Sequence, residues 1–355
     1  MIQWKTIYKR EVMKKRATNR LRLKEDELNI IEEYRGLKKA AEASGVNVDT
    51  VKHAWLKNDK ASLFVKNPNF QIQKQNDFVE KLIKQLDNHS PKYKTIKRKK
   101  SKSGHLMVLD PADIHIGKLC SRLETGQKYN SQIAVQRVLN GVQGILKSSN
   151  GFDIDMINFI GGNDILHIDS PKRQTTGGTP QDTDGMWYEN FITAKKLYVD
   201  VIELLLSISD IHFTFNPSNH DYISGFMLAQ TIESHFRNCK NITFDNSMAH
   251  RKYFKYHNNL IGTTHGDGAK AADLPSLMAH ESKDWTDCTK RYFYTHHVHH
   301  KTSKDYIGCT VESLRSPSTA DTWHHKKGYT GAVEGVEAFI HHKVHGQIAR
   351  LTHIF

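Results

Sequence analysis

Apolar residues along positions 105–355 follow two alternating patterns. Short continuous apolar runs, which are typical of buried strands, lie at 106–109, 156–160 and 211–215. Stretches with apolar residues at helical spacing lie at 133–146, 187–205 and 226–236. Further strands are expected near Leu260, Tyr292 and Ile307 and over 336–345. This alternation, followed by strand-rich sequence, predicts an α/β fold built as a sandwich with two sheets.

The N-terminal segment has a different, helical pattern. Residues 24–58 predict a compact helical unit, in which a first helix ends at Gly36. The stretch 37–57 then matches a helix-turn-helix, with Ala41 at the helix crossing and Gly45 in the turn. The remaining positions of that motif are Val46, Val51 and Ala54 facing inward and Asp49 capping the second helix.

That second helix is predicted to run from Thr50 to Lys57 and to bind DNA. Its outward side chains would be Thr50, Lys52, His53 and Lys57, which can reach a groove or its phosphates. An amphipathic helix over 75–87 and a basic linker follow. The linker carries Lys97, Arg98, Lys99 and Lys100, which are also expected to contact a nucleic-acid backbone. The expected domains are therefore 1–74, 75–104 and 105–355.

The distribution of charge supports this division. The net charge is +13, yet residues 1–104 hold 26 Lys and Arg against 12 Asp and Glu, whereas the rest holds 25 against 26. A basic segment joined to a near-neutral body indicates a polyanion-binding part, with DNA as the expected partner. A lysine-rich surface that is merely solvated is the alternative.

Composition also bears on the compartment. No run approaches the roughly 18 apolar residues of a membrane span, and the charged N-terminus lacks a signal-peptide core. The four cysteines are scattered without a CxxC pair, so neither a zinc ribbon nor a disulfide framework is expected. We therefore expect a cytoplasmic protein of a bacterium or a phage-infected cell, with no membrane partner. The oligomeric state stays open, a homodimer included.

Five short clusters of Asp, Asn and His recur near the ends of the expected strands. Their candidate ligands are Asp113, His115, Asp164, Asn219, His265, His297 and His299. Such oxygen and imidazole donors, gathered at one edge of a sheet, are what a two-metal hydrolytic site needs. Asp113 and His115 are two apart, as are His297 and His299, so an extended backbone would turn both members of each pair to one side. Each residue alone is more often structural; the five clusters together indicate a metal site.

The motifs resemble those of the calcineurin-like metallophosphoesterase family over about residues 105–355. The resemblance implies an α/β/β/α sandwich and a binuclear centre in which a metal-bridging hydroxide hydrolyses phosphodiester bonds. By that resemblance Asp113, His115 and His299 hold one ion, Asn219, His265 and His297 hold the other, and Asp164 bridges both. His220 would face the scissile phosphate as the catalytic residue. Manganese is expected first, with zinc, iron or nickel as alternatives that the donor set leaves open.

Two features of the resemblance point to a substrate. His167 follows the bridging aspartate by three, as in the DNA-repair nuclease branch, so it is a second catalytic candidate, with a structural role as the alternative. The N-terminal helix-turn-helix segment, called the head below, and the polar loop after Asp164 resemble those of phage and prophage members. Glycines usual in the family are replaced by Asn163, Ser218 and His296, which puts loop shape in question.

The leading hypothesis is a DNA nuclease. One alternative is hydrolysis of a small nucleotide or cyclic nucleotide, with the head serving localisation or regulation. Another is a DNA-binding regulator or assembly factor whose metal centre is vestigial.

Overall fold

The computed structural model describes residues 35–57, 62–67, 91–98, 101 and 103–355. The helix expected over 75–87, and Lys99 and Lys100, lie outside these residues. Contacts within the chain divide it into two units, 1–90 and 91–355, which we describe separately. The second unit thus starts at Pro91, ahead of the boundary expected near residue 104.

The first unit is not the all-α helix-turn-helix expected from the sequence. Residues 35–43 are helical, and a short 3₁₀ helix, η1 (Val48–Thr50), follows. The segment predicted as the recognition helix instead forms β1 (His53–Lys57), which pairs antiparallel with β2 (Ser62–Lys66). The helix-turn-helix prediction is therefore wrong in its second helix.

Side-chain alternation explains why this segment is a strand. The rings of His53 and Trp55 both lie against Phe64, with centroids 5.1 and 5.2 Å apart. The alternate residue Leu56 lies against Gly36 of the helix, and Val65 on the partner strand is fully buried. Alternate side chains of this segment thus find contacts on both faces of a hairpin. Those contacts outweigh the helical spacing of Val51 and Ala54.

The turn before the hairpin agrees with the sequence only in part. Ala41 is buried, though among the described residues no second helix crosses it, and Gly45 has a φ of +69°, as expected for a left-handed turn. Val46 is 46% exposed, however, rather than inward-facing. The cap of η1 is Asn47, whose side chain accepts a hydrogen bond from the backbone of Asp49.

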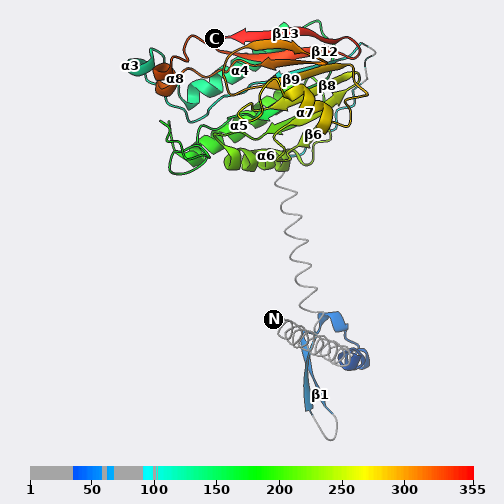
Figure 1. Cartoon of the computed structure of the whole chain (residues 1–355). Helices are drawn as coiled ribbons and strands as arrows, with labels where there is room; N and C mark the ends of the chain where they lie inside the picture. The colour runs from blue at the N-terminus through cyan, green and yellow to red at the C-terminus, as the bar shows by residue number, and fades with distance from the viewer. Residues whose placement is uncertain (1–34, 58–61, 68–90, 99–100, 102) are drawn as a thin grey trace, which may run out of the picture. The chain divides into compact units, whose positions relative to one another are not determined.

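The second unit has a mixed α/β fold built on two sheets (Figure 1). The larger, six-stranded sheet has the order β13-β12-β3-β4-β5-β6, and its strands β3 to β6 are parallel. Their bounds are β3 (His105–Asp110), β4 (Ile154–Gly162), β5 (Ile211–Asn216), β6 (Ile242–Asp245), β12 (Gly335–His342) and β13 (Gly346–Ile354).

The smaller, five-stranded sheet has the order β10-β11-β9-β8-β7, in which β8, β9 and β11 are parallel. Its strands are β7 (Lys252–Tyr256), β8 (Asn259–Thr264), β9 (Lys290–Thr295), β10 (Thr302–Tyr306) and β11 (Cys309–Ser313). Ile307, near which a strand was expected, lies fully exposed in the turn between β10 and β11.

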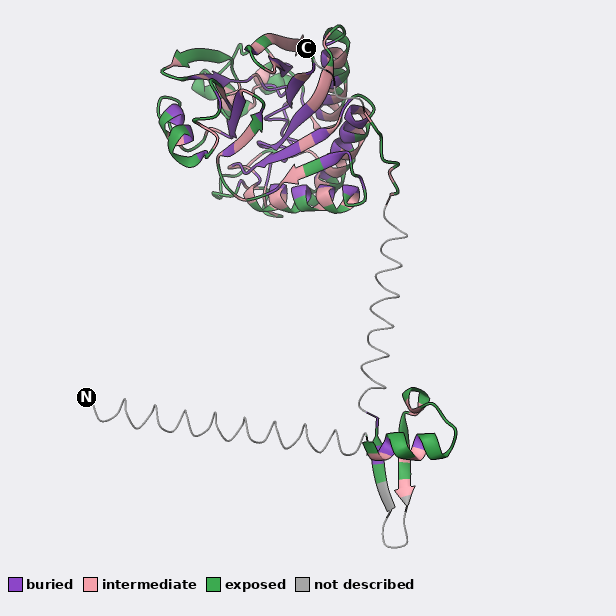
Figure 2. Ribbon diagram, turned by 90° about the vertical axis from the view of Figure 1, so that its right-hand side faces the viewer, coloured by how far each residue is buried: buried purple, intermediate pink, exposed green. Residues whose placement is uncertain are grey.

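Three apolar clusters connect the layers, and the buried strands run through the middle of the unit in Figure 2. Met107 and Leu109 of β3 pack towards α4 (Ser131–Ser148), α5 (Trp187–Leu206) and α6 (Tyr222–Phe236). The alternate residues Leu106 and Val108 pack between the two sheets. On the outer face of the smaller sheet lies α7 (Leu274–Glu281). This arrangement is the α/β/β/α sandwich that the family resemblance implied.

The basic linker is partly attached to the second unit. The backbone of Ile96 exchanges hydrogen bonds of 2.8 and 2.9 Å with the side chain of Asn241, just ahead of β6. The Arg98 guanidinium pairs with Asp210, just ahead of β5. Lys97 remains exposed. Residues 91–98 therefore lie at the edge where the parallel strands begin.

All four cysteines are free and buried. Among the described residues, no helix combines the length and apolar character that crossing a membrane requires.

Candidate metal centre

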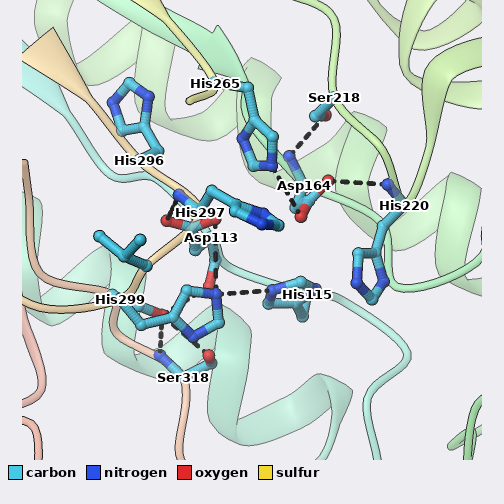
Figure 3. A network of polar contacts seen from close by, with 12 residues as sticks. Asp113, His115, Asp164, Ser218, His220, His265, His296, His297, His299 and Ser318 are labelled. Atoms are coloured by element: carbon cyan, nitrogen blue, oxygen red, sulfur yellow. Dashed lines mark hydrogen bonds and ion pairs between the residues drawn. The ribbon is translucent and has the colours of Figure 1, made fainter. Parts of the chain in front are cut away.

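The candidate ligands lie where parallel strands end, at the edge opposite residues 91–98. Figure 3 shows six of them, Asp113, His115, Asp164, His265, His297 and His299, gathered in one site. Asp113 and His115 follow β3, Asp164 follows β4, and Asn219 and His220 follow β5. His265 follows β8 in the second sheet, and His297 and His299 follow β9. Ligands from two sheets therefore converge on one site, as expected for parallel strands whose carboxyl ends meet at one edge.

The first group consists of Asp113, His115 and His299. Their donor atoms all lie within 4.8 Å of one another, a spacing that could hold a metal ion. The Nε2 atoms of His115 and His299 are 3.3 Å apart, and His299 Nε2 is 3.5 Å from Asp113 Oδ1. This grouping is the one the sequence predicted for the first ion.

The second group consists of Asp164, His265 and His297, again with donor atoms within 4.8 Å of one another. His265 Nε2 lies 3.2 Å from Asp164 Oδ2 and 2.9 Å from Asn219 Oδ1. Asn219 therefore adds an amide oxygen to the group. The structure thus brings all seven predicted ligands together.

A third cluster contains His115, His167 and His220. The Nδ1 atoms of His167 and His115 are 3.3 Å apart, and the rings of His167 and His220 stack at 5.2 Å. His167 is almost fully buried, behind His115 and His220. His167 therefore lies beside the predicted ligand His115 and the predicted catalytic residue His220. Its own catalytic role stays a prediction.

The ligand pairs converge for a reason other than the one expected. Asp113, His115, His297 and His299 all have positive φ, between +51° and +71°, so neither pair lies on extended backbone. Asp164 is also left-handed, at +58°. Such conformations are costly for residues other than glycine and cluster at functional sites, because surrounding contacts must hold them.

Backbone pairing between two loops supplies those contacts. Asp113 N donates to Asn163 O at 2.8 Å, and His115 N donates to Asp164 O at 2.9 Å. The parallel pairing of β3 with β4 thus continues beyond the strands and carries a ligand from each into the site. His297 N donates to Asp113 Oδ2 at 3.1 Å, and this bond connects the loop after β9 to the loop after β3.

The three positions that lack the family's glycine are each accommodated. Asn163 takes a positive φ of +51°, which asparagine tolerates. The Ser218 hydroxyl accepts a hydrogen bond from Asp164 N at 2.8 Å. His296 is buried, with Nε2 at 2.8 Å from Asp110 Oδ2, while the neighbouring His297 takes the left-handed conformation. His300, by contrast, is exposed.

Sequence reasoning missed Asp221. Its carboxylate accepts hydrogen bonds from the Ser218 hydroxyl at 2.6 Å and from Leu166 N at 2.9 Å, so it fixes both loops around Asp164. Burial, together with the charge of Asp164, raises the pKa of Asp221 to about 8. The available signal was its position directly after His220 in the motif Ser-Asn-His-Asp.

The electrostatics of the site favour positive charge. Burial by itself would raise the pKa of Asp164, but the His265 and His220 imidazoles beside it hold that pKa well below its usual range. Burial would likewise raise the pKa of Asp113, but the neighbouring His299 imidazole outweighs this effect and lowers it. Burial lowers the pKa of His265, but the Asp164 carboxylate outweighs it and raises the value to about 9.

The donor set fits a pair of divalent cations. Asp113 and Asp164 are fully buried, and a buried carboxylate requires a compensating cation. Burial and neighbouring imidazoles lower the pKa of His115 and His167 well below the usual range, which keeps both rings neutral and able to donate a lone pair. Mixed oxygen and imidazole donors suit manganese, zinc, iron or nickel.

The centre lies at the floor of a cleft of about 1260 Å³. One wall is the loop at 175–182, and the other is formed by residues around α3 (Arg122–Thr125) and α8 (Thr322–Lys327). Fully buried Lys118 pairs with Asp321 at the start of α8 at 3.1 Å. Sequence reasoning missed both residues, because they lie about two hundred positions apart in the chain.

Four of the predicted DNA-binding residues belong to the first unit. Thr50, Lys52 and His53 are exposed on the first unit, and the backbone of Lys57 ends β1. The Thr50 hydroxyl donates to Asn47 O at 2.7 Å within the local turn. Their contact with DNA stays a prediction.

Comparisons with known proteins give only distant likenesses. No protein-family model matches the chain, and no curated protein matches it. Similar solved structures include Vps29 from Entamoeba histolytica complexed with zinc, with a TM-score of 0.30, 12% identity and coverage of 70% of this chain and 98% of that one. A novel archaeal phosphodiesterase has a TM-score of 0.32 and 7% identity, covering 70% and 99%.

A further similar structure is a conserved protein from Streptococcus pneumoniae described as a predicted phosphoesterase. It has a TM-score of 0.27 and 12% identity, with coverage of 71% of this chain and 98% of that one. Because these TM-scores are low, we base the assignment of the site on the geometry of its side chains alone.

Proposed function

We propose that this protein is a phosphoesterase that depends on two divalent metal ions. The observation that carries the proposal is the side-by-side placement of two three-residue donor groups around Asp113 and Asp164. Phosphate esters resist hydrolysis because both the attacking oxygen and the phosphate are negative. Two ions about 3.5–4 Å apart, when bound, would supply an activated water and neutralise the phosphate.

The chain's own residues hold and orient these partners. Asp164 Oδ2 lies 3.2 Å from His265 Nε2 within the second group, and its other oxygen, Oδ1, accepts a hydrogen bond of 3.0 Å from His220 N. That bond links the proposed bridging carboxylate directly to the proposed catalytic residue. A shift of one would therefore move the other.

His220 is oriented for proton transfer. Its Nδ1 atom lies 2.9 Å from the carbonyl oxygen of His167 and donates to it, so that Nε2 is left for the cleft, which His220 lines. A protonated Nε2 can stabilise the charge on the phosphate or protonate the leaving oxygen. His167 stacks on the ring and limits its movement.

We infer DNA as the leading substrate class. The support is the basic excess of residues 1–104 together with an exposed face on the hairpin of the first unit. There Trp55 and Phe64 are 61% and 40% exposed, Lys66 pairs across the strands with His53 on the same face, and aromatic rings flanked by a cation suit nucleic-acid binding.

One observation favours a small nucleotide as the second candidate. Among the described residues lining the cleft, none is lysine or arginine. A cleft that gripped a long polyanion would be expected to carry such residues, because phosphate contacts dominate that affinity. A nucleotide held mainly through its single phosphate needs fewer of them.

Hydrolysis assays on the full-length protein with manganese test both the phosphoesterase activity and the two candidate substrate classes. The substrates are plasmid, single-stranded and nicked DNA, a cyclic nucleotide and a generic diester. We expect turnover to disappear in Asp164→Asn and His220→Ala, and DNA cleavage to fall in Lys52→Ala/Trp55→Ala while the generic diester is unaffected. Unchanged activity in Asp164→Asn and His220→Ala would refute the phosphoesterase. Faster turnover of the cyclic nucleotide, with no effect of the head variant on DNA cleavage, would favour the small substrate.

A further inference from the structure

Two exposed aromatic side chains form part of the wall of the metal cleft. Trp323 and Tyr329 are 56% and 64% exposed, and both line the cleft that holds the metal centre. Resting on the proposed phosphoesterase function, we propose that they form a stacking platform for an unpaired nucleobase, joined through its sugar to the phosphate at the metal centre. The platform would select nucleotides over other phosphate esters.

The segment that carries these rings is held firmly in place. It joins β11 to β12, and its ends meet where Gly335 N donates to Ser316 O at 3.0 Å. The Ser316 hydroxyl in turn donates to Asp113 O at 2.7 Å, which ties the base of the segment to a ligand. Arg137 pairs with Glu334 at 2.6 Å near its end. A segment anchored at its ends in this way presents its side chains from a fixed base, as binding loops on rigid scaffolds do.

The helix within the segment is capped at both ends. Asp321 Oδ1 accepts a hydrogen bond of 3.0 Å from His324 N at the start of α8. At the other end Gly328 takes a φ of +79°, and Tyr329 N donates to His324 O at 2.9 Å. The backbone positions of Trp323 and Tyr329 are thereby set before a ligand arrives, which lowers the entropy that binding would cost.

A row of ring contacts leads from the metal centre to the platform. His324 stacks on the proposed ligand His299, with centroids 5.2 Å apart and planes at 23°. Trp323 meets His324 edge-on at 5.1 Å, and Tyr329 lies 5.7 Å from Trp323. The platform is therefore two ring contacts away from a ligand, and a base bound there would leave its own phosphate close to the ions.

The composition of the cleft explains why stacking would matter. The described lining residues include no lysine or arginine, so little besides the metal centre can attract a phosphate. Selectivity must then come from the remainder of the substrate. Every base presents a flat face, and stacking on an aromatic side chain contributes to affinity without selecting among bases. A base paired within a duplex does not offer that face.

Calorimetric titration of the full-length protein with manganese tests the platform. Adenosine 5′-monophosphate is compared with ribose 5-phosphate, which has the same phosphate and sugar but no base. We expect the nucleotide to bind about tenfold more tightly. Trp323→Ala and Tyr329→Ala should each remove most of that difference and leave the affinity for ribose 5-phosphate unchanged, and Trp323→Phe should retain it.

The matched control is Trp187→Ala, because Trp187 of α5 is 46% exposed and does not line the cleft. A single-stranded and a duplex oligonucleotide of one sequence, titrated in parallel, identify the source of the base. Weaker binding of the single strand in Trp323→Ala assigns the base to DNA, and weaker binding of the mononucleotide alone assigns it to a small substrate.

Equal affinity of the wild-type protein for the nucleotide and ribose 5-phosphate would overturn the proposal. So would an equal effect of Trp323→Ala and Trp187→Ala. Since the titration measures binding, a protein that stacks the base but hydrolyses nothing would refute the phosphoesterase and leave the platform standing.

Discussion

His265 Nε2 lies 3.2 Å from Asp164 Oδ2, and both side chains are 1% exposed. The two residues come from different sheets, one after β8 and the other after β4. Their contact therefore spans the sandwich and joins the donors of the second group to the carboxylate proposed as the bridge. Asp164 is also the one carboxylate hydrogen-bonded to the backbone of His220 among the described residues.

Asp164→Asn should reduce hydrolysis by more than about 100-fold, because an amide cannot bridge two cations as a carboxylate does. Steady-state rates with a generic diester and manganese give the measurement. Asp182→Asn serves as the control, since Asp182 also lines the cleft but is exposed. Similar losses in both variants would count against the bridging role.

Ser218→Ala should lower kcat by about 10- to 100-fold without unfolding the protein. The hydroxyl links Asp164 N to the Asp221 carboxylate, and losing such supporting contacts around a metal ligand costs activity of that order. Ser218→Thr, which keeps the hydroxyl, should recover part of the rate. Normal kcat in Ser218→Ala would show that the link does not position Asp164.

Gly162→Ala should destabilise the fold far more than Gly126→Ala. Both glycines have similar positive φ, +79° and +76°, so left-handed strain of about 1–2 kcal/mol is common to both. Only at Gly162 would a Cβ meet backbone, 2.1 Å from Asn216 O. We expect a loss above about 4 kcal/mol there in urea unfolding. Equal losses would show that the approach of β4 to β5 can relax.

Stability should fall below pH 6.5 in a way that depends on His341. Burial lowers the pKa of His341 to about 3, whereas the unfolded side chain titrates near 6.5. Between these values only the unfolded chain binds the proton, so this residue removes about 1.4 kcal/mol of stability per pH unit as the pH falls.

Urea unfolding at pH 7.5 and pH 5 measures this effect. His341→Gln should lose about 2 kcal/mol less than the wild type over that interval. His345→Gln, at an exposed position of the same hairpin, should behave like the wild type. An unchanged pH dependence in His341→Gln would contradict the assignment.

The sequence was most informative where the pattern is continuous and local. Alternating strands and helices predicted β3, α4, β4, α5, β5 and α6 because each buries one face in a single core. The seven candidate ligands could be named from their short motifs, which follow β3, β4 and β5 and, in the second sheet, β8 and β9. The edge strand β13 and the short helix α8 were not predicted, since β13 is mostly half-buried without a clear alternation and α8 is largely exposed.

Predictions failed where the outcome depends on distant contacts. Val51 and Ala54 have helical spacing, yet the pairing of Trp55 with Phe64 places their segment in a hairpin. Asp113 and His115 were expected on extended backbone, whereas pairing with the loop after β4 holds both in the left-handed region. The pairing of the Arg98 guanidinium with Asp210 was not predicted either, and a contact of Arg98 with DNA stays a prediction.

Metal analysis after reconstitution with manganese tests the central claim most directly. The full-length protein, dialysed free of unbound metal, should retain two manganese ions per chain, and Asp164→Asn should retain fewer. Two ions would agree with paired donor groups that share one carboxylate. A wild-type protein that retained less than one ion, or an Asp164→Asn variant with an unchanged content, would contradict a binuclear centre.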